Sequence, residues 1–151
     1  MSKRGVLLDA DKLVMDWAFK THNLVPIHMD RAIGIVEDGK LVGAAMFSSY
    51  NTVNANFSYY GKATLTRGIV RVLAKIALYE LKLSRCTIIV PKRPAFLLKK
   101  VHKLNFKYEG VQRRYYGPTD KDQHKGCRFV AFREDLLRLA GLQAEVMENV
   151  S

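Results

Sequence analysis

The segment RAIGIVEDGKLVGAAMFSSYN, residues 31–51, constrains the fold more than any other part of the sequence. Two apolar, β-prone runs flank the tetrapeptide EDGK, and an Asp-Gly pair between such runs is a strong signal for a tight hairpin. We therefore expect strands at about Ala32–Val36 and Leu41–Ser49. The turn NTVN then leads into a third strand at about Ala55–Tyr60, so a three-stranded meander is predicted.

Helical periodicity and further β-prone runs surround this meander. Their order predicts an α/β (α+β) fold, a single domain whose mixed, mostly antiparallel sheet is flanked by helices. The chain of 151 residues suffices for one such domain, expected over residues 1–141, with a tail at 142–151 that frays. The first helix is expected to be capped by Asp9 or Asp11 and to run to Thr21. Further helices are expected at Leu65–Leu83, at Pro94–Leu104 and over EDLLRLAG; the later strands are RCTIIVP, a strand from Phe106, and CRFVAFR.

The start of the helix predicted at Leu65–Leu83 carries charge of an unusual sign. Lys62, Arg67 and Arg71 crowd it, and no acidic residue follows until Glu80. Helix N-termini carry partial positive charge and normally favour Asp or Glu. The basic start therefore needs either an anionic partner or a solvated position for each cation.

A glycine near this helix start favours the anionic partner. Gly68 lies in the first turns, where several backbone N–H groups have no intrahelical acceptor. Together with the helix dipole, these groups form a cradle for phosphate. The alternative is that Thr64 or Thr66 caps the helix while the basic side chains point to water.

The charge of the whole chain is equally uneven. The formal net charge is +11, and between Gly61 and Arg133 there are 18 lysine or arginine residues against 4 acidic ones. Such a concentration predicts an anionic partner: nucleic acid, a phosphorylated cofactor or an acidic protein face. A basic surface that only confers solubility is the other interpretation.

Several classes of chemistry find no support in the sequence. The four histidines lack metal-ligand spacing, so no metal site is expected, and neither a Gly-x-Ser-x-Gly elbow nor a Walker loop is present. Cys86 begins a strand expected to be buried, where cysteines are mostly inert. No apolar run reaches the roughly 20 residues that span a bilayer. We expect a cytoplasmic protein that does not bind membranes.

The order of elements from the hairpin onward, together with two motifs, resembles the GNAT superfamily of N-acetyltransferases. The motifs are YYGKATLTRGIVRVLAKIAL and LNFKYEG, and the second is similar to the family's Leu-Gly-Phe-x-x-Glu-Gly signature with Asn105 in place of glycine. The resemblance covers about Ala32 to Arg133. It implies a turn and helix whose backbone amides bind the pyrophosphate of acetyl-CoA, which serves as co-substrate.

Within this resemblance, the pyrophosphate-binding motif aligns with the helix start described above. Gly68 matches the motif, whereas Leu65 replaces its polar first residue and Val70 replaces its small last residue. Backbone amides bind phosphate whatever the side chain, so the function is retained in this interpretation. The implied cofactor-binding residues are Lys62, Leu65, Thr66, Arg67, Gly68, Ile69, Val70 and Arg71.

The family's usual catalytic side chains are replaced in this chain. Family members often carry a carboxylate on the strand before the motif, where this chain has no acid, and a tyrosine where it has Val101. A hydroxyl or an imidazole is suited to proton transfer. The catalytic candidates are Ser58, Tyr59 and His102, with Tyr60, Tyr115 and Tyr116 as further substitutes.

Three functions remain open from the sequence. The first is an N-acetyltransferase acting on the amine of an unknown acceptor, such as an acidic molecule or protein. The second is a catalytically retired binding or structural module, similar to small GNAT-like proteins of short-tailed bacteriophages, which would place it in the host cytoplasm or the virion. The third is nucleic-acid binding through the basic surface.

Overall fold

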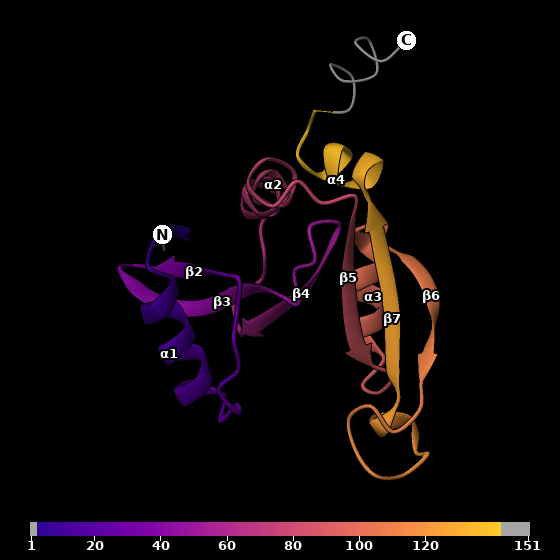
Figure 1. The fold of residues 1–151 in the computed structure, drawn as a ribbon. Helices are drawn as coiled ribbons and strands as arrows, with labels where there is room; N and C mark the ends of the chain where they lie inside the picture. Colours follow the sequence, from indigo (N-terminus) through magenta and orange to yellow (C-terminus); the bar gives the residue numbers. More distant parts are fainter. Residues whose placement is uncertain (1–2, 143–151) are drawn as a thin grey trace, which may run out of the picture.

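The computed structural model describes residues 3–142 as one seven-stranded sheet with helices on both faces (Figure 1). The strand order is β1-β2-β3-β4-β5-β7-β6. The tail predicted to fray lies, apart from Leu142, outside the described residues. The elements are β1 Arg4–Leu7, α1 Asp11–Thr21, β2 Arg31–Glu37, β3 Lys40–Ser48, β4 Asn54–Gly61, α2 Arg67–Lys75, the π-helical turn η1 Ile76–Glu80, β5 Arg85–Pro91, α3 Phe96–Lys103, β6 Lys107–Gln112, the 3-10 turn η2 Asp122–His124, β7 Gly126–Phe132 and α4 Arg133–Leu139.

The predicted meander is confirmed, and its first turn has the expected chemistry. Glu37 pairs with Lys40, and the two residues between them, Asp38 and Gly39, have φ of 52° and 80°. Two left-handed residues in a two-residue turn match the right-handed twist of the strands they join. The strand β1, which pairs antiparallel with β2, was not predicted, because four residues carry too little periodic signal.

Side chains alternate between two cores on opposite faces of the sheet. On β3, Ala45 and Phe47 belong to the core covered by α2, α3 and α4, whereas Ala44 and Met46 belong to the core covered by α1. This alternation is the period-2 pattern of a strand buried on both faces. The observed layers confirm the predicted fold class.

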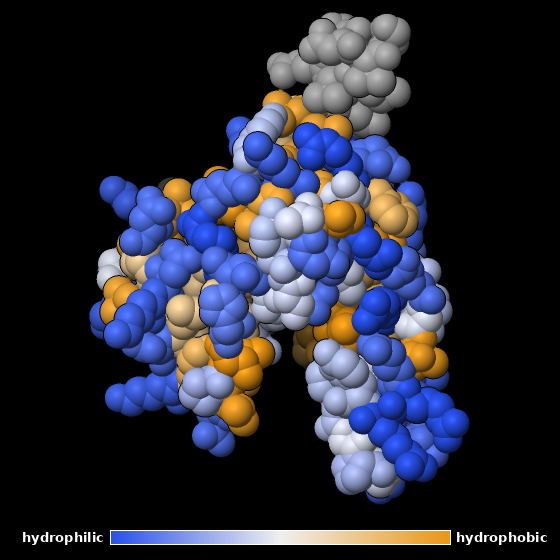
Figure 2. Space-filling model, viewed as in Figure 1, coloured by the Kyte–Doolittle hydropathy of each residue, from blue (hydrophilic) through white to orange (hydrophobic). Residues whose placement is uncertain are grey.

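The sheet parts between β4 and β5. These parallel strands are in register only at Asn54–Arg85, Ala55–Cys86 and Asn56–Thr87, although β4 continues to Gly61 and β5 to Pro91. Beyond the last pair the two halves of the molecule diverge, and a deep notch separates them in the space-filling view (Figure 2). The facing edges therefore carry main-chain groups that are not paired with each other.

The bounds of one helix and the cap of another differ from prediction. The long predicted helix ends as α2 at Lys75 and continues as a π-helical turn, in which Leu81 N donates to Ile76 O at 3.1 Å. Asp11, predicted as a helix cap, accepts instead from the Ala32 amide at 2.8 Å and from Arg31 at 2.9 Å. The acid thus ties α1 to β2.

The turn that leads into α2 is held by a tyrosine lying across two glycines. Tyr59 donates its hydroxyl to Ala63 O at 2.7 Å, and a Cβ added to Gly43 would lie 2.2 Å from that hydroxyl oxygen. Gly61, with φ of 156°, packs at the same place, where a Cβ would meet the Gly43 Cα at 2.6 Å. Tyr59 therefore positions the segment that starts the helix.

We expect Gly43→Ala to lower the free energy of unfolding by about 1–3 kcal/mol, because the new methyl displaces Tyr59 from a packed site. Urea unfolding measures the effect. Gly5→Ala is the matched control, since its Cβ would meet only the Val36 Cγ2 at 4.0 Å. Equal stability of the two variants would contradict the packing argument.

Candidate functional site

The N-terminus of α2 presents unpaired backbone amides. Thr66 caps the helix: its hydroxyl accepts from the Ile69 amide at 3.2 Å and its carbonyl from Val70 at 2.9 Å. Within residues 3–142, no acceptor faces the amides of Arg67 and Gly68. A Cβ added to Gly68 would meet only the Thr66 hydroxyl, at 4.0 Å, so the approach to these amides is open.

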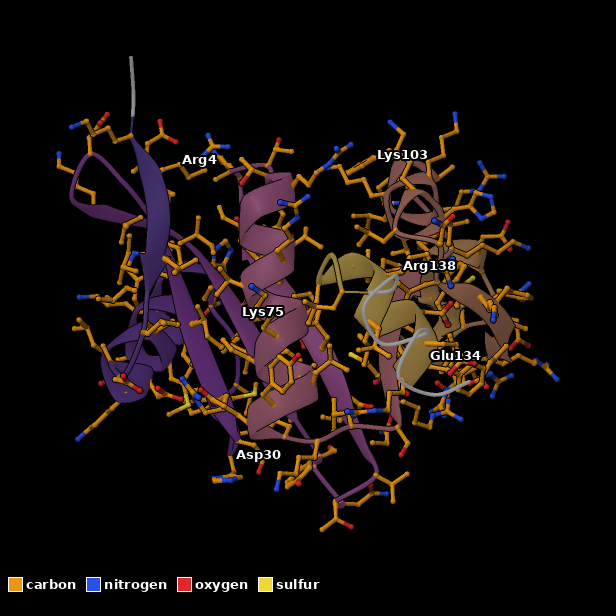
Figure 3. The ribbon with its side chains drawn as sticks, turned by 90° about the horizontal axis from the view of Figure 1, so that it is seen from above. Arg4, Asp30, Lys75, Lys103, Glu134 and Arg138 are labelled. Carbon is orange, nitrogen blue, oxygen red and sulfur yellow. The ribbon has the colours of Figure 1, made fainter. Side chains whose placement is uncertain are left out.

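Cations surround this helix start. Lys62 and Arg67 are exposed, and among the described residues no carboxylate lies within 4.0 Å of either. Arg4 lies beside the start of α2 (Figure 3), where its guanidinium donates to Thr64 O at 2.9 Å and pairs with Glu37 at 2.7 Å. The first turn of α2 contains no acid. The whole region therefore favours an anion.

The other residues matched to the phosphate motif face elsewhere. Leu65 and Val70 line the apolar interior, and Ile69 is buried. Arg71 is one turn further along α2, with its Nε 3.5 Å from the position that a Cβ on Gly141 would take. It therefore sits at the C-terminal end of α4, where a cation is favoured by the helix dipole.

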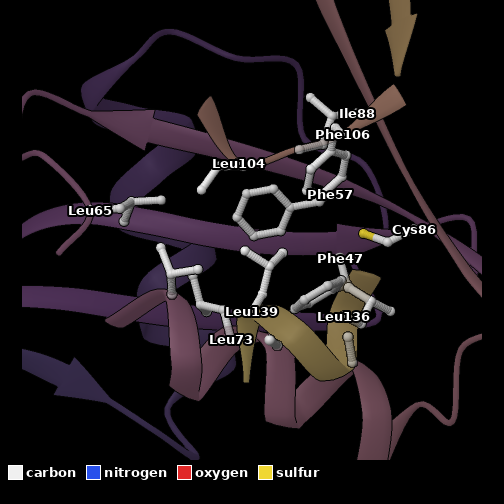
Figure 4. A pocket seen from close by; sticks show the side chains of 13 residues that line it. Phe47, Phe57, Leu65, Leu73, Cys86, Ile88, Leu104, Phe106, Leu136 and Leu139 are labelled. Carbon is white, nitrogen blue, oxygen red and sulfur yellow. The ribbon is translucent and has the colours of Figure 1, made fainter. Parts of the chain in front are cut away.

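The interior beneath α2 contains a cavity of about 50 Å³. Phe57 from β4 and Ile88 from β5 line it together with Leu104 and Phe106, which follow α3 (Figure 4). No polar side chain other than the thiol of Cys86 is among the described residues that line it. This space is part of the hydrophobic core, and it lies where the two strands begin to diverge.

The opposite face of β4 carries a group of hydroxyls and rings. Tyr60 packs in the core covered by α1, with its ring 5.8 Å from the His22 ring at the end of that helix. Tyr115 and Tyr116 stack edge to face at 4.8 Å, and Tyr116 donates its hydroxyl to Ile89 O on β5 at 2.8 Å. Phenols from both halves of the parted sheet thus lie on one face.

Burial controls the protonation of these phenols. It raises the pKa of Tyr60, the neighbouring Tyr115 phenol raises it further, and a contact with the Ser58 hydroxyl acts in the opposite direction. Burial also raises the pKa of Tyr116. Tyr60 and Tyr116 therefore keep their protons at neutral pH.

His22 adds an unpaired nitrogen to this group. Its Nε2 is buried and has no hydrogen-bond partner in the part of the chain that the structure describes. Its ring also contacts Trp17, with 5.7 Å between the centroids. A buried polar atom without a partner calls for an explanation, and this nitrogen keeps a lone pair or a proton that no described group uses.

The three catalytic candidates occupy different places. Ser58 lies beside Tyr60. Tyr59 faces the other side of β4, and its proton is bound to Ala63 O. His102 is exposed on α3 and lines a groove with Lys99, Lys103 and other residues away from β4. Only Ser58 of the three belongs to the group formed by Tyr60, His22, Tyr115 and Tyr116.

Two residues of the site were missed by the sequence. Arg4 reaches the helix start from a strand about 60 residues earlier, and His22 was set aside with the other histidines because they lack metal-ligand spacing. No sequence pattern links Arg4, near Met1, to the motif at the helix start. Likewise, no sequence pattern links His22, at the end of one helix, to a strand 38 residues later.

Cys86 is not a nucleophile in this structure. It is buried at the start of β5, and burial raises the pKa of its thiol to about 12. We expect iodoacetamide at pH 8 to leave Cys86 unmodified in the folded protein, since about one thiol in ten thousand is then ionised. Peptide mass mapping with and without urea measures this, and rapid alkylation of the native protein would contradict it.

The described residues limit other kinds of site. No group of three or more histidine, cysteine or acidic side chains among residues 3–142 could hold a metal ion. In the same range, no helix is both long and apolar enough to cross a bilayer.

Comparisons with known proteins give the same architecture. No protein-family model and no curated protein sequence matches the chain. Among solved structures, a mutant form of the spermidine/spermine N-acetyltransferase SpeG from Vibrio cholerae superposes with a TM-score of 0.67 at 12% identity, over 91% of this chain and 98% of that one.

Two further structures support the likeness. The ribosomal-protein-S5-alanine acetyltransferase of Vibrio fischeri matches with a TM-score of 0.63 and 14% identity, over 89% of this chain and 94% of that one. A probable acetyltransferase matches with a TM-score of 0.56 and 21% identity, over 80% of this chain and 68% of that one. The chain therefore has the fold of the GNAT N-acetyltransferases.

Proposed function

We propose that the protein is an acetyl-CoA-dependent N-acetyltransferase. The observation that carries the proposal is the parting of β4 from β5 next to a helix start where two amides and two cations, Lys62 and Arg67, have no partner among residues 3–142. An extended ligand bearing both amide groups and phosphates fits such a place, because strand edges and helix N-termini recognise those groups. The fold it shares with known acetyltransferases agrees with this choice.

The residues present fit the proposed co-substrate. The amides of Arg67 and Gly68 would hold its pyrophosphate, with charge supplied by Lys62, Arg67 and Arg4. Because Val53 O accepts from Ser84 and Arg85, strand alternation directs the main-chain groups of Phe57 and Tyr59 toward β5. These groups are suited to hold the amides of the pantetheine arm. Acetyl-CoA supplies an acetyl group activated as a thioester.

Proton transfer is assigned to the other face of β4. The Tyr60 phenol has a raised pKa, so it retains a proton that it can give to a leaving thiolate. Ser58 lies next to it, and we assign to His22, whose Nε2 has no partner among the described residues, the acceptance of a proton from the incoming amine. Tyr115 and Tyr116 would orient that amine.

We further propose an acceptor whose body is acidic, either a small molecule or a protein face. The loop between β6 and β7 carries Arg113, Arg114, Lys121 and Lys125 against two aspartates. This loop contains Tyr115 and Tyr116 and would attract negative charge toward the amine site. A cytoplasmic location fits this co-substrate and the two free cysteines.

Thermal melting with and without acetyl-CoA tests the co-substrate directly. A ligand present at 100 times its dissociation constant raises the free energy of unfolding by about 2.7 kcal/mol. For a chain of this size, this raises the melting temperature by about 5–10 °C. No shift at millimolar acetyl-CoA would overturn the proposal.

A second measurement separates an active site from a retired one. The release of the CoA thiol from acetyl-CoA is followed with acidic peptides, amino acids and polyamines as acceptors. A melting shift with acetyl-CoA, but no thiol release in the presence of any acceptor class, would favour the retired binding module. Salt-sensitive binding of nucleic acid without any response to acetyl-CoA would favour the nucleic-acid interpretation.

A further inference from the structure

We infer that the groove between α3 and the strands β6 and β7 is a second ligand site, which binds a small organic anion with an aromatic or acyl body. The groove encloses about 600 Å³, within the range of small-molecule sites of about 300–1,000 Å³. It is distinct from the cavity beneath α2, with which it shares no lining residue.

The floor of the groove is apolar. Phe129 of β7 and Tyr108 of β6 meet edge to face with their centroids 5.5 Å apart. Leu98 and Cys127 complete the floor. Tyr108 is 61% exposed, so a large aromatic face remains uncovered between the helix and the sheet. An aromatic ring or acyl chain of a ligand can be buried against it.

The rim of the groove is basic. Lys99 and Lys103 are four residues apart on α3, where like charges repel each other, and among the described residues no carboxylate lies within 4.0 Å of either. Lys92 lies on the opposite rim and pairs with Asp122 at 3.6 Å. His102 completes the rim, and none of the described residues that line the groove is acidic. A negatively charged group is therefore the complement of this rim.

The helix α3 lies between this groove and the apolar cavity beneath α2. Leu104, which follows the helix, lines that cavity, whereas Leu98, Lys99 and Lys103 line the groove. None of the residues proposed to hold the co-substrate lines the groove. The inference therefore does not rest on the proposed acetyl transfer. A ligand of the groove is expected to bind together with acetyl-CoA.

Isothermal titration calorimetry of the full chain with 1-naphthyl phosphate tests the inference, and neutral 1-naphthol is the matched ligand. We expect the phosphate to bind and the naphthol to bind at least tenfold more weakly. The double variant Lys99→Gln, Lys103→Gln is expected to weaken binding of the phosphate by about tenfold, because it removes two exposed ion pairs and each contributes modestly. Lys100→Gln is the control, since Lys100 lies over Phe96 outside the groove.

Five results would overturn the inference. The first three are no binding of the phosphate, equal binding of the neutral compound, and equal weakening by Lys100→Gln. The fourth is displacement of the phosphate by CoA, which would assign the groove to the nucleotide end of the co-substrate. The fifth concerns the oligomeric state. A dimer that dissociates in the double Lys→Gln variant, seen by size-exclusion chromatography with light scattering, would assign it to a second copy of the chain.

Discussion

Replacing Gly68 by glutamate is expected to abolish the thermal shift produced by acetyl-CoA, from about 5–10 °C to none, while leaving the protein folded. The side chain would enter the space now open above the amides of Arg67 and Gly68 and bring a negative charge to the place proposed for pyrophosphate. The only described atom near the new Cβ is the Thr66 hydroxyl, at 4.0 Å. The fold therefore has no reason to change.

The same substitution is expected to stabilise the protein without ligand. Glutamate has a better helix propensity than glycine by about 0.5 kcal/mol, and an acid in the first turn gains about 0.3–1 kcal/mol from the helix dipole. Opposite changes in stability and in binding are the signature of a site in which an anion, rather than a side chain, completes the helix start.

Lys75→Gln is the matched control for this variant. It changes the net charge by the same amount, on the same helix, at the end far from Gly68. We expect it to keep the response to acetyl-CoA. If both variants lost the response equally, general electrostatic attraction would explain binding and the amide cradle would be wrong.

Tyr60→Phe is expected to lower kcat by about a hundredfold, which is the low end of the effect of a positioned proton donor. The thermal shift with acetyl-CoA should remain, since the phenol lies on the face of β4 opposite α2. Because burial raises the pKa of Tyr60 above its ordinary value of 10.0, the phenol stays protonated through neutral and mildly alkaline pH. Deprotonation of Tyr60 should therefore cause no loss of the wild-type rate below about pH 10.

Tyr50→Phe controls for the chemical change. Its hydroxyl donates to Leu81 O at 2.8 Å, so the variant also loses one hydrogen bond, but outside the site. Its kcat is expected to match the wild type. If Tyr59→Phe removed turnover while Tyr60→Phe did not, the proton donor would lie on the α2 face, and the assignment to Tyr60 would be wrong.

The parts of the fold that were predicted depend on local chemistry. Asp38 and Gly39 carry the left-handed turn of the first hairpin wherever the rest of the chain lies, and the apolar runs beside them form β2 and β3. Thr66 caps α2 through atoms within three residues of itself. Such features require only neighbours in sequence, so one sequence is enough to find them.

The contacts that the sequence does not record depend on sheet order. Arg71, which was implied to bind the cofactor, has its guanidinium beside Gly141, because α4 packs against α2. Asp11 caps no helix, because β2 offers it an amide and a guanidinium. In both cases the side chain meets a tertiary partner, and no local pattern records that partner.

The sequence by itself determined the meander, the unusual basic start of α2 and the order of elements that resembles the GNAT family. Only the tertiary structure brought Arg4 to that helix start and Tyr60 to His22, and only it parted β4 from β5 after Asn56. The physical reason is the range of the interactions. Turns, caps and strand alternation arise from bonds a few residues long, whereas a site assembled from separate strands and helices exists only after the sheet has ordered them.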